Sequence, residues 1–278
     1  MVSKLLVVGA SGYVGARVER DLSGVFSVTG TCNSKQLNDK QVKLDIRDIN
    51  ATFELFDRVR PDVVVHAAAL ASSSECNNNP ELARAINVDG TINLVRAANK
   101  VGARFIFISA ATVKLNSTQY EKTKAEAEEI VRSEAPAFDI VQPLVVFGIS
   151  PNIWTKKPSN QIFNNVNGEG AAKYDNSWRF QPTWINDISA VVRFLIEHNI
   201  DGETVPVAVS DGGLKTNFEI ARDILSNFGI KPEPVSSSSR PDFPMDLGRM
   251  KKLSMPMHTY SQMIEGIVAE LKAGKRKA

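Results

Sequence analysis

The sequence predicts an α/β protein with a doubly wound parallel sheet and a smaller C-terminal cap. In the first half, short apolar runs rich in β-branched residues alternate with longer stretches at helical spacing, which is typical of a parallel sheet wrapped by helices. The first apolar run leads directly into a glycine-rich turn. After about residue 148 the alternation gives way to loops. We therefore place one domain at 1–148 and assign 149–278 mainly to the cap, with some segments returning to the sheet.

The expected elements follow the chain in order. Strands buried on both faces of a parallel sheet are continuously apolar, and the runs that fit best are 4–8, 26–32, 63–66, 105–108 and 138–141. Apolar residues at helical spacing predict helices over 13–22, 50–59, 81–101, 119–133, 185–198, 217–228 and 259–272. Clusters of Pro, Asn, Gly and Ser predict loops over 150–158, 164–176 and 236–244.

The composition excludes several classes of protein. Lys and Arg number 33 against 31 Asp and Glu, which disfavours a dedicated nucleic-acid or acidic-membrane binder. No run approaches the roughly 18 apolar residues of a membrane-spanning helix. Two cysteines and three scattered histidines offer neither a disulfide framework nor metal-ligand spacing. We expect a reduced, cytoplasmic protein without a bound metal that acts on a small molecule.

The glycine turn Gly9-Ala-Ser-Gly12-Tyr-Val-Gly15 predicts a dinucleotide site. Gly9 permits a tight turn, Gly12 lets the backbone approach a pyrophosphate, and Gly15 lets the helix pack closely on the strand. The helix that follows offers N–H groups and its positive dipole end to the phosphate. Because the turn lies between an apolar strand and a helix, it indicates a Rossmann-type fold. The residues expected beside the cofactor are Gly9, Ser11, Gly12, Tyr13, Val14 and Gly15.

The residues after the second strand predict which dinucleotide is bound. Folds that prefer NAD carry Asp or Glu about 20 residues after the turn, where it holds the ribose 2′-hydroxyl. Here no carboxylate follows Asp21 until Asp39, and the second strand ends in Thr31-Cys-Asn33-Ser34-Lys35. Amide, hydroxyl and ammonium donors suit a 2′-phosphate. We therefore expect NADP in preference to NAD, bound by Asn33, Ser34 and Lys35.

A second motif, Tyr120-Glu-Lys-Thr-Lys124, predicts the reaction. Residues four apart share a helix face, so Tyr120 and Lys124 project together. A phenol has a pKa of about 10, and a nearby ammonium favours phenolate and lowers that pKa. The preceding strand, 105–108, ends at the expected cofactor crevice. The pair therefore predicts general acid/base chemistry beside a nicotinamide.

Together these residues resemble an extended short-chain dehydrogenase/reductase, and more narrowly the dTDP-4-dehydrorhamnose reductase-like branch of sugar-nucleotide reductases. The resemblance runs from Gly9 to Asp187 in the order of the family. The segments that carry it, besides the two motifs above, are Leu44-Asp-Ile-Arg-Asp48, Val65-His-Ala-Ala-Ala69, Asn87-Val-Asp-Gly-Thr91, Val146-Phe-Gly148 and Gln181-Pro-Thr183 with Asp187.

The resemblance implies further site residues. They are Asp45 and Ile46 at the adenine, Ala67, Ala68 and Ala69 at the pyrophosphate and ribose, Asn87 near the active centre, and Pro143 and Leu144 near the nicotinamide. Lys124 would also bind the ribose hydroxyls. From the residues alone, Asp45 equally suits a cap for the helix near Asn50, the alanines suit a tightly packed core, and Asn87 suits a polar position within a helix.

The sequence departs from the family where the substrate carbonyl is bound. The family places Ser or Thr near the end of the strand before Tyr120, and the matching residue here is Ala110. Side chains alternate along an extended chain, so Thr112 lies on the side of Ala110 and is the substitute we favour, with Ser109 as the alternative. Further departures are the short segment 114–119 in place of a long loop, Gln142 in place of an arginine and Ser74 in place of an acidic residue. These departures favour a smaller or less charged carbonyl substrate, or weakened catalysis.

The cap is expected to shape the substrate pocket, because aromatic walls with basic groups suit a nucleotide base and its phosphates. The candidates are Trp154, Lys156, Lys157, Gln161, Trp178, Arg179 and Phe180, of which Gln161, Trp178 and Arg179 are preferred. The resulting hypothesis is an NADPH-dependent reductase of a ketone or keto-sugar, with Tyr120, Lys124 and Thr112 as catalytic residues. Two alternatives stay open: a non-catalytic NADP(H)-binding regulatory protein, like the regulatory subunit of methionine adenosyltransferase in this branch, and an epimerase or dehydratase that retains NAD. The resemblance also implies a homodimer through 81–101 and 119–133.

Overall fold

The computed structural model describes residues 3–155, 157–211, 213–237 and 240–275. The chain forms two compact units. The first comprises residues 1–142 and 189–205, and the second comprises 143–188 and 206–278. Residues 189–205 therefore return to the first unit after the chain has entered the second. Within the described residues, no helix is long and apolar enough to cross a bilayer.

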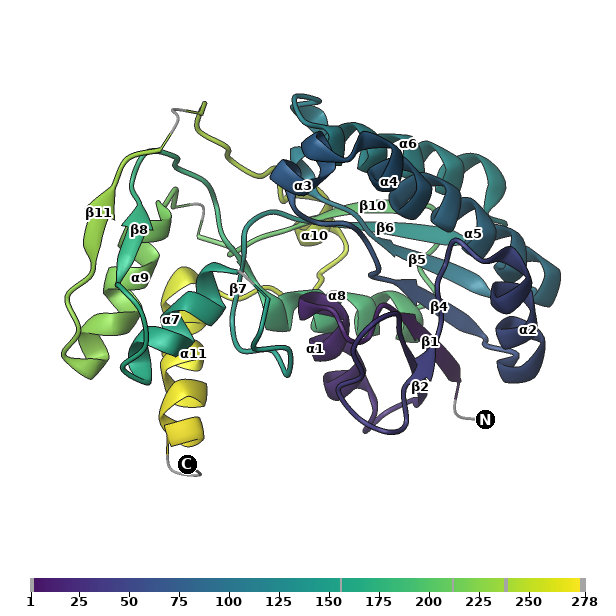
Figure 1. The fold of residues 1–278 in the computed structure, drawn as a ribbon, viewed down its shortest axis with the longest axis horizontal. Coiled ribbons are helices and arrows are strands. Elements are labelled where there is room, and N and C mark those ends of the chain that lie inside the picture. The colour runs from purple at the N-terminus through teal and green to yellow at the C-terminus, as the bar shows by residue number, and fades with distance from the viewer. Residues whose placement is uncertain (1–2, 156, 212, 238–239, 276–278) are drawn as a thin grey trace. The chain divides into compact units, whose positions relative to one another are not determined.

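The first unit is built on a seven-stranded sheet (Figure 1). Its strands are β1 (Lys4–Val8), β2 (Ser27–Cys32), β3 (Val42–Lys43), β4 (Val63–His66), β5 (Arg104–Ile108), β6 (Phe138–Pro143) and β10 (Glu203–Val207). They lie in the order β10-β6-β5-β4-β1-β2-β3, and β1 pairs in parallel with both β2 and β4. The order reverses between β1 and β4. The predicted α/β class with a doubly wound sheet is confirmed.

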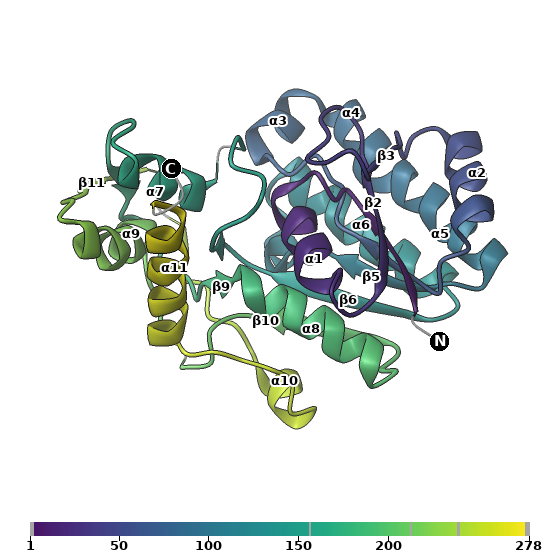
Figure 2. The same cartoon turned by 90° about the horizontal axis from the view of Figure 1, so that it is seen from below.

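Helices cover both faces of this sheet (Figures 1 and 2). They are α1 (Tyr13–Leu22), α2 (Ile49–Val59), α3 (Ser73–Asn78), α4 (Pro80–Arg84), α5 (Gly90–Val101), α6 (Gln119–Glu134) and α8 (Ile185–Glu197). The helices α2, α5 and α6 lie on one face, and α1 and α8 lie on the other. The helix predicted over 81–101 is interrupted, because a π-helical turn η1 (Ala85–Asp89) separates α4 from α5.

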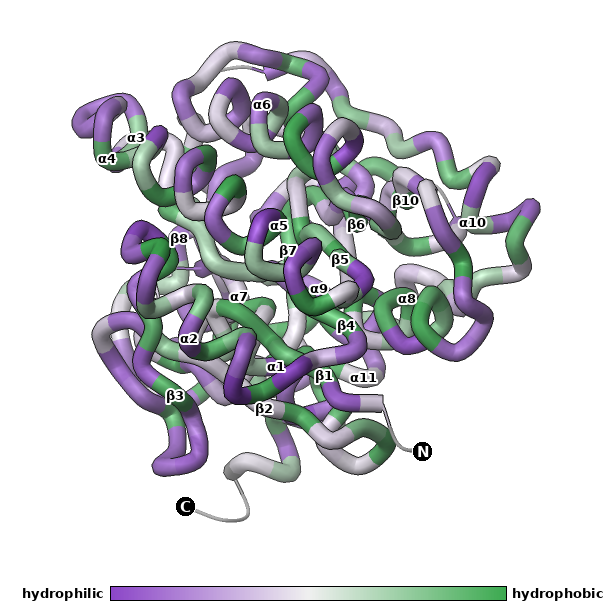
Figure 3. The backbone as a smooth tube through the Cα atoms, turned by 90° about the vertical axis from the view of Figure 1, so that its right-hand side faces the viewer, coloured by the Kyte–Doolittle hydropathy of each residue, from purple (hydrophilic) through white to green (hydrophobic). Residues whose placement is uncertain are grey.

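The core of the first unit lies between the sheet and the helices α2, α5 and α6. Phe105 and Phe107 of β5 are fully buried there, together with Leu94 of α5 and Val131 of α6. Burying one such side chain stabilises the fold by about 1.5–3 kcal/mol relative to leaving it exposed. Figure 3 shows hydrophobic chain along β4 and β5 and hydrophilic chain in the loop that leads to β3. The apolar strand pattern of the sequence thus fixes which segments are interior.

The second unit contains two small sheets, β7 with β9 and β8 with β11. Its elements are β7 (Val146–Phe147), α7 (Pro158–Val166), β8 (Lys173–Asp175), β9 (Thr183–Trp184), α9 (Asn217–Leu225), η3 (Ser226–Phe228), β11 (Glu233–Val235), α10 (Gly248–Lys252) and α11 (Tyr260–Lys275). The predicted loop 164–176 is wrong at both ends, since it overlaps the end of α7 and includes β8.

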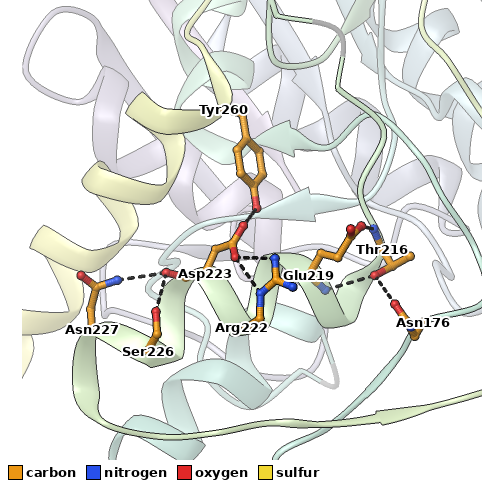
Figure 4. Close-up of polar contacts among 8 residues, drawn as sticks. All are labelled: Asn176, Thr216, Glu219, Arg222, Asp223, Ser226, Asn227 and Tyr260. Atoms are coloured by element: carbon orange, nitrogen blue, oxygen red, sulfur yellow. Dashed lines mark hydrogen bonds and ion pairs between the residues drawn. The ribbon is translucent and has the colours of Figure 1, made fainter.

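Helix α9 is the polar centre of this unit (Figure 4). Thr216 and Glu219 form a capping box at its start, and the Thr216 hydroxyl also donates to Asn176 Oδ1 at 2.9 Å. Further along the helix, Asp223 Oδ2 accepts a 2.8 Å hydrogen bond from the Tyr260 hydroxyl. Burial first, and then this carboxylate, raise the pKa of Tyr260. These contacts tie α9 to the start of α11 and to the segment that follows β8.

Candidate functional site

The glycine turn joins β1 to α1, and two of its glycines lie where there is no room for a side chain. Gly9 has a φ of +83°, and a Cβ placed there would lie 2.6 Å from the backbone nitrogen of Ala68. A Cβ on Gly15 would lie 2.2 Å from Gly9 O. The turn is closed by Gly12 N donating to Gly9 O at 2.9 Å, and Gly9 N donates to Thr31 Oγ1 at 3.1 Å. Any other residue at Gly9 or Gly15 would force the turn open.

The residues around this turn fit a dinucleotide. Helix α1 starts directly after Gly12, which has no side chain with which to cap that end. Its first turn presents backbone N–H groups and a positive dipole end, which favour a phosphate. Ala67 and Ala68 follow β4, the strand beside β1 at the point where the strand order reverses, where open α/β sheets bind ligands. Glycines, alanines and a helix N-terminus together form a cradle that a Cβ at Gly9 would fill.

The residues expected at the 2′-phosphate lie in the exposed segment after β2. Asn33, Ser34 and Lys35 are all exposed there. Sequence reasoning missed a carboxylate nearby: a Cβ on Gly30 of β2 would lie 2.0 Å from Glu19 Oε1. Burial raises the pKa of Glu19, while a 2.7 Å hydrogen bond from Gln41 Nε2 opposes that rise. No signal in the sequence connects a residue in the middle of α1 to the end of β2.

The predicted adenine contacts are engaged with the protein. Asp45 forms an ion pair with Arg47, with Oδ2 2.5 Å from Nη2, and this hydrogen bonding lowers the pKa of Asp45. The alternative role for Asp45 as a helix cap is wrong, because Asp48 caps α2 by accepting from Ala51 N at 3.0 Å. Ile46 is 6% exposed and belongs to the core.

The start of α6 is fixed by its own polar residues. Thr118 and Glu121 form a capping box, and Glu121 Oε2 also accepts from the Ser117 hydroxyl at 2.7 Å. Gln119 N donates to Asn77 Oδ1 of α3 at 2.9 Å. A capping interaction of this kind contributes roughly 1 kcal/mol. These contacts define where the helix begins, and so where Tyr120 stands on it.

Lys124 is a buried amine at the end of β5. Its side chain is 2% exposed, its Nζ donates to Ile108 O at 2.8 Å, and Nζ lies 3.8 Å from the centroid of the Phe107 ring. Burial lowers the pKa of Lys124 to about 7, although Glu128 opposes the shift. Removing an ammonium from water disfavours its charged form. Near neutral pH the amine is therefore poised between its two protonation states.

Burial shifts the pKa of Tyr120 in the opposite direction to that of Lys124. Burial is the main cause that raises the pKa of Tyr120, and Cys76 and Glu121 raise it further. This is opposite to the direction expected from the Tyr/Lys spacing, because loss of solvent disfavours the phenolate and the neighbouring Cys76 and Glu121 add to the rise. The phenol is thus protonated at neutral pH and suits the role of a proton donor.

Ala110, where the family places Ser or Thr, lies just after the end of β5. Ala110 is 8% exposed with an extended backbone, at φ −150° and ψ 138°. Thr112 lies in the 3₁₀ turn η2 (Ala111–Lys114) and is half-buried. The Ser109 hydroxyl is buried, and it makes no hydrogen bond to any residue that the structure describes. Because the chain turns at η2, it is not extended from 110 to 112, and the alternation that placed Thr112 on the side of Ala110 does not apply.

The candidates from Pro143 onward belong to the second unit. Pro143 ends β6, and Leu144 N donates to Thr183 Oγ1 at 2.9 Å. A cavity of about 730 Å³ in this unit is lined by residues between 153 and 171. It brings together Trp154, Lys157 and Gln161, whereas Lys156 lies outside the described residues. Burial lowers the pKa of Lys157.

Trp178 and Arg179 are not among the residues that line this cavity. Trp178 packs on Phe180 with ring centroids 4.8 Å apart, and its Nε1 donates to Pro241 O at 3.0 Å. Arg179 Nη2 donates to Leu214 O at 3.4 Å. Trp178 and Phe180 are buried, which is the structural role usual for aromatic side chains. Within the described residues, no group of three or more His, Cys, Asp and Glu side chains could hold a metal ion.

Comparison with known protein families shows which family this chain belongs to. A model described as the NAD dependent epimerase/dehydratase family matches residues 5–141, and one described as the RmlD substrate binding domain matches residues 115–273. The chain belongs to the extended short-chain dehydrogenase/reductase family, in its RmlD-like branch. Together the two matches cover the glycine turn, the Tyr/Lys motif and most of the second unit.

The relatives of this RmlD-like chain include subunits of methionine adenosyltransferase and dTDP-4-dehydrorhamnose reductases. Methionine adenosyltransferase 2 subunit beta from Bos taurus is 24% identical, over 92% of this chain and 84% of its own length. A dTDP-4-dehydrorhamnose reductase from Aggregatibacter actinomycetemcomitans is 26% identical, over 75% of this chain and 72% of its own length.

Solved structures share the fold. The dTDP-4-dehydrorhamnose reductase of Bacillus anthracis, in complex with NADP, has a TM-score of 0.81 at 21% identity and covers 97% of this chain and 99% of its own. The UDP-glucose 4-epimerase of Thermotoga maritima, with UDP-glucose, has a TM-score of 0.82 at 18% identity and covers 99% of both chains.

Proposed function

We propose that this chain is an NADP(H)-dependent reductase that converts a ketone of the keto-sugar class to an alcohol. The observation that carries the proposal is the placement of Tyr120 and Lys124 four residues apart on α6, with Lys124 reaching the end of β5 in the same unit as the glycine cradle. The end of β5 lies at the edge of the sheet where dinucleotides bind. Family membership supports a nicotinamide cofactor.

In this proposal, each group of residues has a separate role in binding the cofactor or in the reaction. The glycine turn and α1 hold the pyrophosphate, Asn33, Ser34 and Lys35 hold the 2′-phosphate, and Pro143 and Leu144 border the nicotinamide. When bound, the cofactor supplies a hydride to the carbonyl carbon. Tyr120 gives its phenolic proton to the carbonyl oxygen, and burial, which raises the pKa of Tyr120, keeps that proton in place at neutral pH until the transfer. Lys124 orients the ribose by exchanging its hydrogen bond to Ile108 O for one to a ribose hydroxyl.

The proposed reaction is tested by NADPH oxidation across a panel of keto-sugars and small ketones. We expect Tyr120→Phe to reduce kcat by roughly 10²–10⁴-fold, because it removes the proton donor and retains the ring. Lys122→Met is the matched control, since Lys122 is exposed on the same helix, and it should leave kcat unchanged. Activity that survives in Tyr120→Phe would exclude Tyr120 from the mechanism.

The preference for NADP is tested separately by binding. We expect Lys35→Ala to weaken NADPH binding roughly tenfold and to leave NADH binding nearly unchanged, because only NADPH carries a phosphate for Lys35 to contact. Equal losses for the two dinucleotides would contradict the assignment of Asn33, Ser34 and Lys35 to the 2′-phosphate.

A second function, a non-catalytic NADP(H)-binding subunit, is favoured by two observations. Ala110 lacks the hydroxyl that binds the substrate carbonyl, and the curated relatives include a protein named as a subunit of methionine adenosyltransferase 2. NADPH binding without turnover of any ketone, together with co-purification of a partner enzyme, would support this function over the reductase.

A further inference from the structure

Asn87 joins separate segments of the first unit. Its side chain is 2% exposed, and its Oδ1 accepts from Leu70 N at 2.8 Å. Its Nδ2 donates to Leu70 O at 3.2 Å and to Thr123 Oγ1 at 3.0 Å. Both N–H groups of the amide are therefore used by the protein. An amide with both donors engaged acts as a clamp between protein segments, and not as a donor to a cofactor.

Thr123 extends this contact to the helical turn that carries Tyr120. The side chain of Thr123 is 5% exposed, and its hydroxyl accepts from Asn87 while its one proton is directed at Gln119 O and Tyr120 O, 2.9 Å and 3.0 Å away. A continuous chain of hydrogen bonds thus runs from Leu70, after β4, through Asn87 and Thr123 to the backbone of Tyr120.

The backbone of Asn87 is itself held in an unusual shape. It lies in the π-helical turn η1, and its carbonyl accepts from the Thr91 hydroxyl at 2.7 Å. His66 Nε2 lies 3.0 Å from the same hydroxyl. Since the Thr91 proton goes to Asn87 O, His66 must be the donor, which fixes its neutral tautomer. Burial lowers the pKa of His66, in agreement with that tautomer. Such π-turns are rare and are frequently found at functional sites.

We propose that Asn87 and Thr123 are positioning residues that hold Tyr120 in register with the crevice segment 67–70. The proposal rests on the proposed function, in which residues 67–69 contact the dinucleotide and Tyr120 gives the proton. Proton transfer requires heavy atoms about 2.6–3.2 Å apart. A misplacement of about 1 Å can cost roughly 100-fold in rate. Three hydrogen bonds from one buried amide limit movement between the crevice and Tyr120.

The position of Tyr120 is measured directly by ¹⁹F NMR of the full chain with 3-fluorotyrosine at residue 120. Thr123→Val removes the hydroxyl and keeps the shape, whereas Thr123→Ser keeps the hydroxyl. We expect Thr123→Val to shift or split the ¹⁹F line, and Thr123→Ser to retain the single line of the parent. Thr52→Val is the matched control, because Thr52 is fully buried in the first turn of α2 and its hydroxyl donates to Asp48 O at 2.8 Å.

Two functional readouts separate positioning from cofactor binding. Thr123→Val should bind NADPH within about 3-fold of the parent, since Asn87 still holds Leu70 through two hydrogen bonds. For any ketone that the parent reduces, Thr123→Val should lower kcat roughly 100-fold with a smaller change in KM, and Thr123→Ser should restore it. Asn87→Leu should weaken NADPH binding by more than about 10-fold, because it also releases Leu70.

An unchanged ¹⁹F line in Thr123→Val would overturn the proposal, as would a line that moves equally in Thr52→Val. A role limited to stability would lower the unfolding midpoints of Thr123→Val and Thr52→Val alike and leave the ¹⁹F line in place, which also overturns it. If no variant, nor the parent, reduces any ketone while Thr123→Val alone moves the line, the reductase fails and the positioning pair stands.

Discussion

Replacing Lys124 by Met should change how the stability of the protein depends on pH. The side chain is buried, and burial lowers its pKa from 10.5 to about 7. A cation whose pKa is lower in the folded state destabilises the fold most at low pH, where the ammonium must be buried. That cost disappears as the pH rises above the folded pKa, because the amine is then buried neutral while the unfolded chain still binds the proton. The wild-type protein therefore gains stability from Lys124 as the pH rises from 7 towards 10.5.

The size of this gain follows from the two pKa values. At pH 9.5 the folded amine is about 2.5 pH units above its pKa, and the unfolded amine is still mostly protonated. Each unit contributes about 1.4 kcal/mol, so the free energy of unfolding of the wild type should rise by about 3 kcal/mol between pH 6 and pH 9.5 on account of this group. Lys124→Met lacks that rise. The stability difference between the two proteins should thus move by about 3 kcal/mol in favour of the wild type over this range.

Urea unfolding followed by far-UV circular dichroism measures this difference. Tryptophan fluorescence is unsuitable, because Trp154, Trp178 and Trp184 all lie in the second unit and Lys124 lies in the first. Lys122→Met is the matched control, since Lys122 is exposed on the same helix, and its difference from the wild type should be independent of pH. If Lys124→Met also differs from the wild type by the same amount at pH 6 and pH 9.5, the amine is not buried with a low pKa and the reasoning is wrong.

Three further predictions concern the two units. Gly9→Ala should abolish NADPH binding, measured by fluorescence titration, while Gly24→Ala should leave it intact, because a Cβ on Gly24 meets no described atom within 4 Å. Arg104→Met should destabilise the fold by about 3–5 kcal/mol in urea at pH 9, because it leaves the Asp139 carboxyl, whose pKa burial already raises to about 7, without its partner, and adding Asp139→Leu should recover most of the loss. Tyr260→Phe should cost about 1–2 kcal/mol by tryptophan fluorescence, because it removes the hydrogen bond to α9; a change under about 0.3 kcal/mol would mean that this bond contributes nothing.

Several elements of the first unit were predictable because their signals are local, whereas β3, β10 and α3 were not predicted. The strand 4–8 and the helix 13–22 were placed at their true ends, since a continuous apolar run and a glycine turn mark them in the sequence. The helix 81–101 was predicted whole because apolar spacing does not distinguish a π-turn from an α-turn, and here the π-turn contains Asn87, whose side chain reaches Leu70. In the second unit, α7 was missed because its Asn-rich sequence resembles a loop and its buried face becomes clear only from the fold.

The site was predictable in its residue types and not in its electrostatics. Spacing alone places Tyr120 and Lys124 on one helix face, but it does not reveal how far each is removed from water. Burial, which depends on the packing of β5 and α3 against α6, raises one pKa and lowers the other. The role of Thr123 was equally hidden, because its partner Asn87 lies 36 residues earlier in the chain. Long-range contacts of this kind leave no periodic pattern in a single sequence.

The missing hydroxyl at Ala110 can be weighed against the rest of the site by its energy. Removing one preorganised donor to a developing oxyanion costs about 2.7–4 kcal/mol, or 10²–10³ in rate. Enzymes lower barriers by at least about 8 kcal/mol, so the loss of one donor slows a reductase without abolishing its activity. Ala110→Ser should therefore raise a weak parental kcat by about 10²–10³. If the parent is inactive and Ala110→Ser gains nothing while NADPH still binds, the deficit lies elsewhere and the non-catalytic function is favoured. The buried clamp at Asn87 would then serve to hold the dinucleotide crevice rather than to align a proton transfer.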